Sequence, residues 1–268
     1  MKKPFQFAII KLGGSAVTDK TKFKTVRRNV IKGIAPILKR YHDKIGKMII
    51  VHGGGSFGHP IAKKYNIDKG LTESNKIGLS ETVDAMRELS LEISTIFRNF
   101  GLPIFPVQPS SFFITKNGEI INDSNLIVIR EALKHNLIPM LWGDAVFDIS
   151  IGCSILSGDK IILHLAKKLR PNVVVFGSDV EGIFINKNGI RQLVRKITNK
   201  NFNEILKSIS LSSQIIDVTG GIISKIMIMR EIAKLGIKTC LVSLFDPENL
   251  YKALVGEDFV GTLFDRLK

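Results

Sequence analysis

Short apolar runs alternate with longer amphipathic stretches along this chain of 268 residues. This alternation is typical of a largely parallel sheet with helices on both faces. The expected strands are Phe5–Leu12, Lys47–His52, Pro103–Gln108, Leu137–Trp142, Asn172–Gly177, Ile237–Val242 and Phe259–Phe264. The expected helices are Val26–Tyr41, Glu73–Phe100, Ser124–His135, Asp159–Leu169 and Ile222–Leu235. The pattern therefore predicts an α/β fold.

The stretch Glu73–Phe100 is the most regular of the helical patterns. Apolar residues recur in it at spacings of three and four, which places them on one face of a helix. They are Leu79, Val83, Met86, Leu89, Ile93, Phe97 and Phe100. We expect most of this face to enter the core and part of it to line an apolar ligand pocket, because ordinary core residues line such pockets.

Two short segments, Lys116–Glu119 and Asn186–Gly189, predict β-hairpins. Asn and Gly readily adopt the positive φ angles that tight turns require. Pro171 begins a new strand, but no internal repeat, low-complexity tract or linker divides the chain. We therefore expect a single domain over residues 1–268.

The chain carries a formal net charge of +15, from 39 basic and 24 acidic residues. Such a balance can indicate nucleic acid or an anionic membrane as the partner. Here the basic residues are scattered among apolar ones, and aromatic residues make up only 7%. We expect neither partner. A well-solvated surface and attraction of small anionic substrates remain as explanations of the charge.

The location of the protein is also constrained by the sequence. No stretch of about 18 uncharged apolar residues is present, as a membrane-spanning helix would require. The apolar run after Lys2 and Lys3 is too short for a signal peptide and lacks a cleavage site. Cys153 and Cys240 stand alone, which provides neither a disulfide framework nor a zinc site. We expect a cytoplasmic protein with no metal site of its own.

Three glycine clusters each follow a predicted strand and precede a helix. They are Gly13–Gly14 within Lys11–Ser15, Gly53–Gly58, and Gly220–Gly221 after Thr219. Backbone N–H groups at such a turn, together with a helix N-terminus, can hold an anion. Three such turns at the carboxyl edge of one sheet indicate a ligand with several phosphates.

The second cluster matches several motifs at once. The pattern G-x-G-x-x-G at 53–58 fits a dinucleotide fingerprint, but the first βα turn of the chain is a different loop. The pattern at 52–55 fits the oxyanion loop of a hydrolase, and the pattern at 54–58 fits its nucleophile elbow. In a hydrolase these are separate segments, whereas here they share residues, so the hydrolase interpretation fails. No Gly-x4-Gly-Lys-Ser/Thr loop is present, which excludes a P-loop ATPase at the level of motifs.

Three lysines accompany the glycine clusters. Lys11 ends the first strand, Lys20 lies in the following loop, and Lys225 falls one turn into the helix after the third cluster. A solvated surface position is the ordinary explanation for a lysine. Lys11 differs, because a charge at the end of an apolar strand requires a partner.

At these residues the sequence resembles the amino acid kinase superfamily and, within it, the isopentenyl phosphate kinases. The resemblance covers nearly the whole chain. It is carried by KLGGSAVTDK at 11–20, VHGGGSFGHP at 51–60, QPSSF at 108–112, GD at 143–144, SGD at 157–159, SDVEGI at 178–183 and IDVTGGIISK at 216–225. His59 marks isopentenyl phosphate kinases and the related fosfomycin kinases, whereas acetylglutamate, aspartate and uridylate kinases lack it.

The resemblance implies a three-layer αβα sandwich, with the acceptor site in the N-terminal half and the nucleotide site in the C-terminal half. It also implies ATP with Mg²⁺, a homodimer, and phosphorylation of isopentenyl phosphate to isopentenyl diphosphate in isoprenoid biosynthesis, by the alternate mevalonate route. A fosfomycin-type or other small-phosphonate kinase is the alternative, and isopentenyl, dimethylallyl and geranyl phosphate all remain open as acceptors. A non-enzymatic sensor on this fold would lack the lysines, and all three are present.

By position, the resemblance implies roles for individual residues. Contacts with ATP would come from Lys11, Leu12, Gly13, Gly14, Ser15, Gly55, Asp179, Gly221 and Lys225. The acceptor phosphate would be held by Gly54, His59 and Gly158. The catalytic residues would be Lys11, Lys20, His59, Asp159 and Lys225, with Asp159 orienting the lysines. Lys160 departs from the pattern, because close relatives carry a second acid there.

Overall fold

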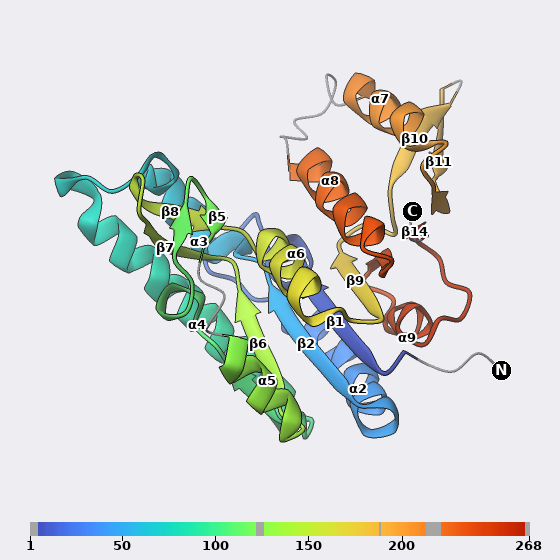
Figure 1. The fold of residues 1–268 in the computed structure, drawn as a ribbon, viewed down its shortest axis with the longest axis horizontal. Helices are drawn as coiled ribbons and strands as arrows, with labels where there is room; N and C mark the ends of the chain where they lie inside the picture. Colours follow the sequence, from blue (N-terminus) through green and yellow to red (C-terminus); the bar gives the residue numbers. More distant parts are fainter. Residues whose placement is uncertain (1–4, 122–125, 188, 213–220, 266–268) are drawn as a thin grey trace.

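An eight-stranded sheet runs through the computed structural model, which describes residues 5–121, 126–187, 189–212 and 221–265 (Figure 1). The strand order is β12-β14-β13-β9-β1-β2-β6-β3. All neighbours pair in parallel except β13 and β14. The strands are β1 (Phe7–Leu12), β2 (Lys47–His52), β3 (Ile104–Pro106), β6 (Ile138–Trp142), β9 (Val173–Ser178), β12 (Lys196–Ile197), β13 (Lys238–Ser243) and β14 (Thr262–Phe264).

Helices cover both faces of this sheet, because its central strands are apolar on both sides. On β1, Ala8 and Ile10 belong to one buried cluster, and Ile9 between them belongs to the other. The first cluster is closed by α2 (Arg28–Ile45), α3 (Gly55–Lys64), α4 (Lys76–Asn99) and α9 (Pro247–Val255). The second is closed by α5 (Leu126–Lys134), α6 (Gly158–Leu169), α7 (Phe202–Ser212) and α8 (Gly221–Lys234). The predicted three-layer αβα arrangement is confirmed.

Two small sheets flank the large one. The first has the order β5-β4-β7-β8, and the second pairs β10 with β11. Their strands are β4 (Thr115–Lys116), β5 (Glu119–Ile120), β7 (Asp144–Asp148), β8 (Gly152–Leu156), β10 (Phe184–Lys187) and β11 (Ile190–Leu193). Asn117 and Gly118 have φ of 50° and 73°, which confirms the first predicted hairpin. The second is confirmed by the β10–β11 pair, although Asn188 lies outside the described residues.

The long predicted helix differs from the structure at both ends. Residues Glu73–Asn75 form a 3-10 turn, because the Asn75 side chain accepts a hydrogen bond from the Thr72 N–H at 2.8 Å. Helix α4 then begins at Lys76 and ends at Asn99. Phe100 follows the helix and is 37% exposed, so it is the member of the predicted face that stays outside the core. The other predicted members of the stripe are buried or half-buried.

Other differences are smaller or lie in segments without a strong pattern. Helix α2 extends four residues beyond the predicted end and stops before Gly46, whose φ is 120°. The predicted start of α5 at Ser124 lies outside the described residues. Helices α7 and α9 and the β7–β8 hairpin were not predicted. Helix α9 nevertheless has a recognisable beginning, because Asp246 caps it and Pro247 occupies its first turn.

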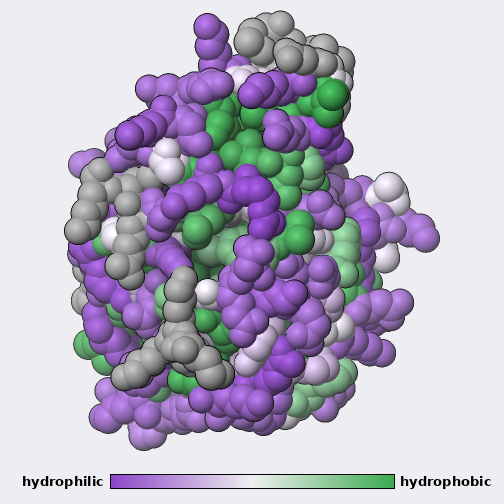
Figure 2. Space-filling model, turned by 90° about the vertical axis from the view of Figure 1, so that its right-hand side faces the viewer, coloured by the Kyte–Doolittle hydropathy of each residue, from purple (hydrophilic) through white to green (hydrophobic). Residues whose placement is uncertain are grey.

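One face of the molecule is largely hydrophilic (Figure 2). Figure 2 shows the right-hand side of Figure 1, where hydrophilic side chains predominate and apolar ones gather mainly in the upper part. None of the helices in the described ranges is both long enough and apolar enough to cross a membrane.

Candidate active site

A cleft of about 920 Å³ opens at the carboxyl ends of β1, β2, β6 and β9. The loops that follow these strands line it, each bringing residues from a different part of the sequence. Parallel strands direct their carboxyl ends to one edge of the sheet, and this edge is where open α/β sheets bind ligands. The cleft is thus in the place that the glycine clusters predicted.

The first two glycine loops touch each other across the cleft floor. A Cβ atom added to Gly14 would lie 2.5 Å from the backbone nitrogen of Gly55, so no side chain fits there. Gly55 itself has φ of +49°, a conformation that glycine adopts readily. Gly221 begins α8, whereas Thr219 and Gly220 of the third cluster lie outside the described residues. The floor is therefore formed by the backbone of the two loops, with no room for a side chain at Gly14.

Lys11 has the partner that its position required. It is 7% exposed at the end of β1, and its ammonium group forms an ion pair with Asp159 at the beginning of α6. Burial lowers the pKa of Lys11, Asp159 acts in the opposite direction, and the positive charge of Lys225 lowers it further. Lys11 and Lys225 are therefore close enough in the cleft to influence each other.

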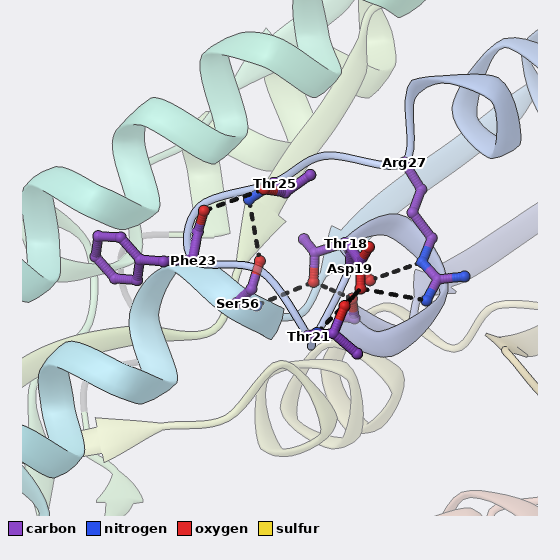
Figure 3. Close-up of polar contacts among 8 residues, drawn as sticks. Thr18, Asp19, Thr21, Phe23, Thr25, Arg27 and Ser56 are labelled. Carbon is purple, nitrogen blue, oxygen red and sulfur yellow. Dashed lines mark hydrogen bonds and ion pairs between the residues drawn. The ribbon is translucent and has the colours of Figure 1, made fainter.

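Lys20 is carried by a loop that is fixed at its base (Figure 3). Asp19 accepts hydrogen bonds from the backbone N–H and the hydroxyl of Thr21, at 3.0 and 2.7 Å. The backbone N–H of Asp19 donates to the carbonyl of Thr25 at 2.8 Å, which closes the loop. Lys20 itself is exposed and lines the cleft. It acts electrostatically on both His59 and Asp179.

His59 lies beside the second glycine loop, on α3. A Cβ atom added to Gly54 would lie 3.3 Å from both the His59 ring and the sulfur of Met86. The surrounding protein lowers the pKa of His59, and the charges of Lys20 and Lys11 lower it further. His59 is therefore neutral near pH 7 before an anion binds, and it can donate one hydrogen bond.

Asp179 follows β9 at the opposite side of the cleft. Its carboxylate accepts hydrogen bonds from the hydroxyls of Ser15 and Ser178, both at 3.0 Å. Partial burial acts to raise the pKa of Asp179, but these hydrogen bonds and the charge of Lys20 hold it below the usual value. The first glycine loop is thus tied to the C-terminal half of the chain.

Most of the residues singled out in the sequence line this one cleft. They are Lys11, Gly13, Gly14, Ser15, Lys20, Gly54, Gly55, His59, Gly158, Asp159, Asp179 and Lys225. Leu12 is not among them. Its side chain is fully buried in the core and its carbonyl accepts a hydrogen bond from the N–H of Gly53, so its place in the nucleotide site stays a prediction. The alternation of side chains along β1 turns Leu12 away from the cleft.

The apolar end of the cleft differs in part from the prediction. Met86 lines it, together with Ala62, Thr82 and Ile155. Leu79 and Val83 pack with the small buried cluster around Ala62 and Cys153 and do not line the cleft themselves. From the predicted apolar face of this helix, Met86 therefore lines the cleft, whereas Leu79 and Val83 do not.

Lys160 stands where close relatives carry a second acid, and its contacts show how a basic residue is accommodated there. Its ammonium group donates to the Gly118 carbonyl at 2.8 Å and contacts the Glu119 carboxylate at 2.9 Å. The side chain therefore reaches the β4–β5 hairpin, while Asp159 pairs with Lys11. The two neighbours serve different parts of the structure.

Sequence reasoning overlooked Asp144, although it lies in the quoted GD motif. It lines the cleft and is 2% exposed, and it accepts hydrogen bonds from the backbone N–H groups of Ser110 and Ala145, at 3.1 and 3.0 Å. Burial raises the pKa of Asp144 to about 7, although the hydrogen bonds act in the opposite direction. The sequence did offer a signal: Asp144 is an acidic residue between two apolar runs, with no basic residue beside it.

Comparisons with known proteins agree with this geometry. The model of the amino acid kinase family matches residues 6–243. Isopentenyl phosphate kinase of Methanocaldococcus jannaschii is 36% identical over 261 residues, covering 93% of this chain and 95% of its own. Isopentenyl phosphate kinase of Arabidopsis thaliana is 28% identical and covers 95% of this chain and 94% of its own.

Solved structures give the same result. An X-ray structure of isopentenyl phosphate kinase superposes with a TM-score of 0.81 at 27% identity, covering 96% of this chain and 99% of its own. The product complex of the T. acidophilum isopentenyl phosphate kinase has a TM-score of 0.77 at 26% identity, with coverages of 96% and 99%. The chain belongs to the amino acid kinase family, and within it to the isopentenyl phosphate kinases.

Proposed function

We propose that this protein transfers the γ-phosphoryl group of ATP to isopentenyl phosphate, producing isopentenyl diphosphate for isoprenoid biosynthesis by the alternate mevalonate route. One observation carries the proposal: the cleft joins a floor of glycines and lysines to an apolar end lined by Met86, Ala62 and Ile155. A phosphate with a hydrocarbon tail has these same two parts. His59 stands where the two parts meet.

The residues of the cleft suit phosphoryl transfer. The reaction passes through a loose transition state, which requires alignment and charge neutralisation more than bond-making groups. Lys11, Lys20 and Lys225 would neutralise the transferred phosphoryl group, and Asp159 would hold Lys11 in place. The attacking oxygen of an alkyl phosphate is largely ionised at neutral pH, because its second pKa is about 6. No general base is then required.

We assign the acceptor to the N-terminal half of the fold and ATP to the C-terminal half. His59, Gly54 and Gly158 would hold the acceptor phosphate, with the neutral His59 ring donating a hydrogen bond. Gly13, Gly14, Ser15 and Gly55 would hold the phosphates of ATP, with Asp179, Gly221 and Lys225 on the nucleotide side. Both halves share the one large sheet, which supports a single domain over residues 1–268.

Magnesium would enter with the nucleotide. The described parts of the chain contain no group of three or more His, Cys, Asp or Glu side chains that could bind a metal ion. This arrangement fits an ion held mainly by phosphate oxygens and water, as Mg²⁺ is in many kinases. When bound, the ion would neutralise charge on the nucleotide. We also propose a cytoplasmic homodimer that binds neither nucleic acid nor membrane.

A panel of acceptors tests the proposal. ADP release should be measured with isopentenyl, dimethylallyl and geranyl phosphates and with fosfomycin. We expect isopentenyl phosphate to give the highest kcat/KM, because the cleft continues from the phosphate floor into apolar side chains. The fosfomycin-type alternative is not favoured. A higher kcat/KM for fosfomycin than for every alkyl phosphate would overturn the proposal.

A further inference from the structure

Thr18 occupies the junction of three segments around the cleft, although its side chain does not line the cleft. Its side chain is fully buried, at 0% exposure, directly after the short helix α1 (Gly14–Val17). The hydroxyl donates to the carbonyl of Gly14 at 2.7 Å and accepts from the backbone N–H of Ser56 at 3.0 Å. One oxygen atom therefore connects the first glycine loop to the second.

Gly55 is shaped to receive this hydroxyl. A Cβ atom at Gly55 would lie 2.0 Å from the Thr18 Oγ1 atom, so the hydroxyl fills the space in which a side chain would stand. The Ser56 N–H belongs to the first turn of α3, where amides have no partner within the helix. Thr18 takes up this amide with its hydroxyl oxygen. The glycine and the threonine are thus parts of one arrangement.

The same junction fixes the loop that carries Lys20, as Figure 3 shows. The Ser56 hydroxyl accepts from the Thr25 N–H at 3.2 Å, and the Ser56 carbonyl accepts from the Lys24 N–H at 3.1 Å. On the other side, the Arg27 side chain donates to the Thr18 carbonyl at 3.0 Å. Both ends of the loop are therefore attached to the Thr18–Ser56 pair.

We infer that Thr18 is a positioning residue for phosphoryl transfer, whose hydroxyl fixes the two glycine loops and the Lys20 loop in a single geometry. This inference rests on the proposed function. Misplacement of charged groups by a fraction of an ångström reduces the transition-state stabilisation more than ground-state binding. Loss of the hydroxyl should therefore lower kcat while ATP still binds.

The test uses Thr18→Val, which keeps the size of the side chain and removes its hydroxyl. We expect kcat with isopentenyl phosphate to fall by about 30-fold or more and KM for ATP to change by less than about 3-fold. Thr18→Ser should recover most of kcat, because it restores the hydroxyl. Hydrogen exchange of the amides of residues 19–25, followed by mass spectrometry, should become about 10-fold faster in Thr18→Val.

Thr239→Val is the matched control. Thr239 is equally buried in β13, and its hydroxyl donates to the Ile237 carbonyl at 3.2 Å, outside the cleft. We expect kcat and the exchange of residues 19–25 to stay at the wild-type level. Should Thr18→Val be too unstable to purify, Ser56→Ala removes the attachment of the Thr25 N–H and should also speed exchange of the loop.

Three results would overturn the inference: a Thr18→Val enzyme within about 3-fold of the wild-type kcat, a folded Thr18→Ser variant that recovers no activity, or equal losses in Thr239→Val. A wild-type chain inactive on every acceptor would overturn the proposed function instead. The exchange measurement would then be the only test of whether the Thr18 hydroxyl fixes the Lys20 loop. Unchanged exchange in Thr18→Val would count against that role.

Discussion

Lys11 and Asp159 form an ion pair between the end of β1 and the beginning of α6, 148 positions apart in the sequence. Both side chains are largely buried, and Lys225 lies near enough to lower the pKa of Lys11. A buried charge without its partner is strongly unfavourable, so each member depends on the other. The pair holds the positive charge of Lys11 at the cleft floor, where both side chains still line the cleft.

Lys11→Ala and Lys225→Ala should both lower kcat more than they raise KM for ATP. Their charges matter most when negative charge moves to the bridging oxygen of the transition state. Lys11→Ala should cause the larger loss, because it also leaves Asp159 without its partner. Steady-state kinetics measures both constants, with Lys39→Ala on the outer surface of α2 as the control. An effect on KM alone would show ordinary ground-state binding.

His59→Ala should lower acceptor phosphorylation by about 100-fold or more, because a group that aligns and polarises a phosphate contributes several kcal/mol in phosphoryl transfer. The free energy of unfolding should change little, since the ring is exposed at the cleft wall. Turnover of isopentenyl phosphate and chemical denaturation measure the two effects. Near-normal turnover in the purified variant would exclude the proposed role of His59.

Asp144 should make the protein less stable as the pH rises from about 4 to about 7. Its pKa is raised to about 7 in the folded state, so the folded chain retains a proton that the unfolded chain has released over this range. The stability contribution is complete below the unfolded pKa and is lost as the pH passes through the folded one. Asp144→Asn cannot titrate and should lack this loss.

Urea denaturation at pH 5 and pH 8 measures this difference. Relative to Asp144→Asn, the wild type should lose at least about 1 kcal/mol of unfolding free energy between the two values. The comparison with the variant is needed because burial lowers the pKa of His52 to about 4, which acts with the opposite sign below pH 6.5. A constant difference between the two proteins across this range would contradict the assignment.

Lys160→Ala should have small effects, because its ion pair with Glu119 lies at the surface, where side-chain exposures are 38% and 75%. Exposed pairs contribute between 0 and about 1 kcal/mol. We expect kcat within about 3-fold of the wild type and a similarly small loss of stability in Glu119→Ala. A loss of kcat comparable to that of Lys11→Ala would instead place Lys160 in the reaction.

Met86→Ala should admit longer acceptor tails, because Met86 lines the apolar end of the cleft. A closely packed wall excludes extra methylene groups at a cost of about 1 to 3 kcal/mol. The ratio of kcat/KM for geranyl over isopentenyl phosphate should rise, with KM for ATP unchanged. Leu91→Ala is the control, since Leu91 is 63% exposed on the same helix. Leu79→Ala and Val83→Ala should raise the ratio less.

The sequence by itself determined the central strands, several of the helices and the glycine loops that line the cleft. Alternating apolar runs predict the central strands, because strands buried on both faces must be apolar throughout. Glycines after these strands predict the phosphate floor, and the lone charge of Lys11 predicts a partner without identifying it. The resemblance supplied Asp159 and His59. Every one of these signals is local or a matter of order along the chain.

The tertiary structure alone decided what lies against what. The hydroxyl of Thr18 meets Ser56, and Asp144 becomes buried beside Ser110, only because strands distant in sequence are neighbours in the sheet. Leu12 turns from the cleft into the core because side chains alternate along β1. Hydrogen bonds and desolvation depend on neighbours within a few ångströms, and these neighbours are fixed by packing, which no local pattern records.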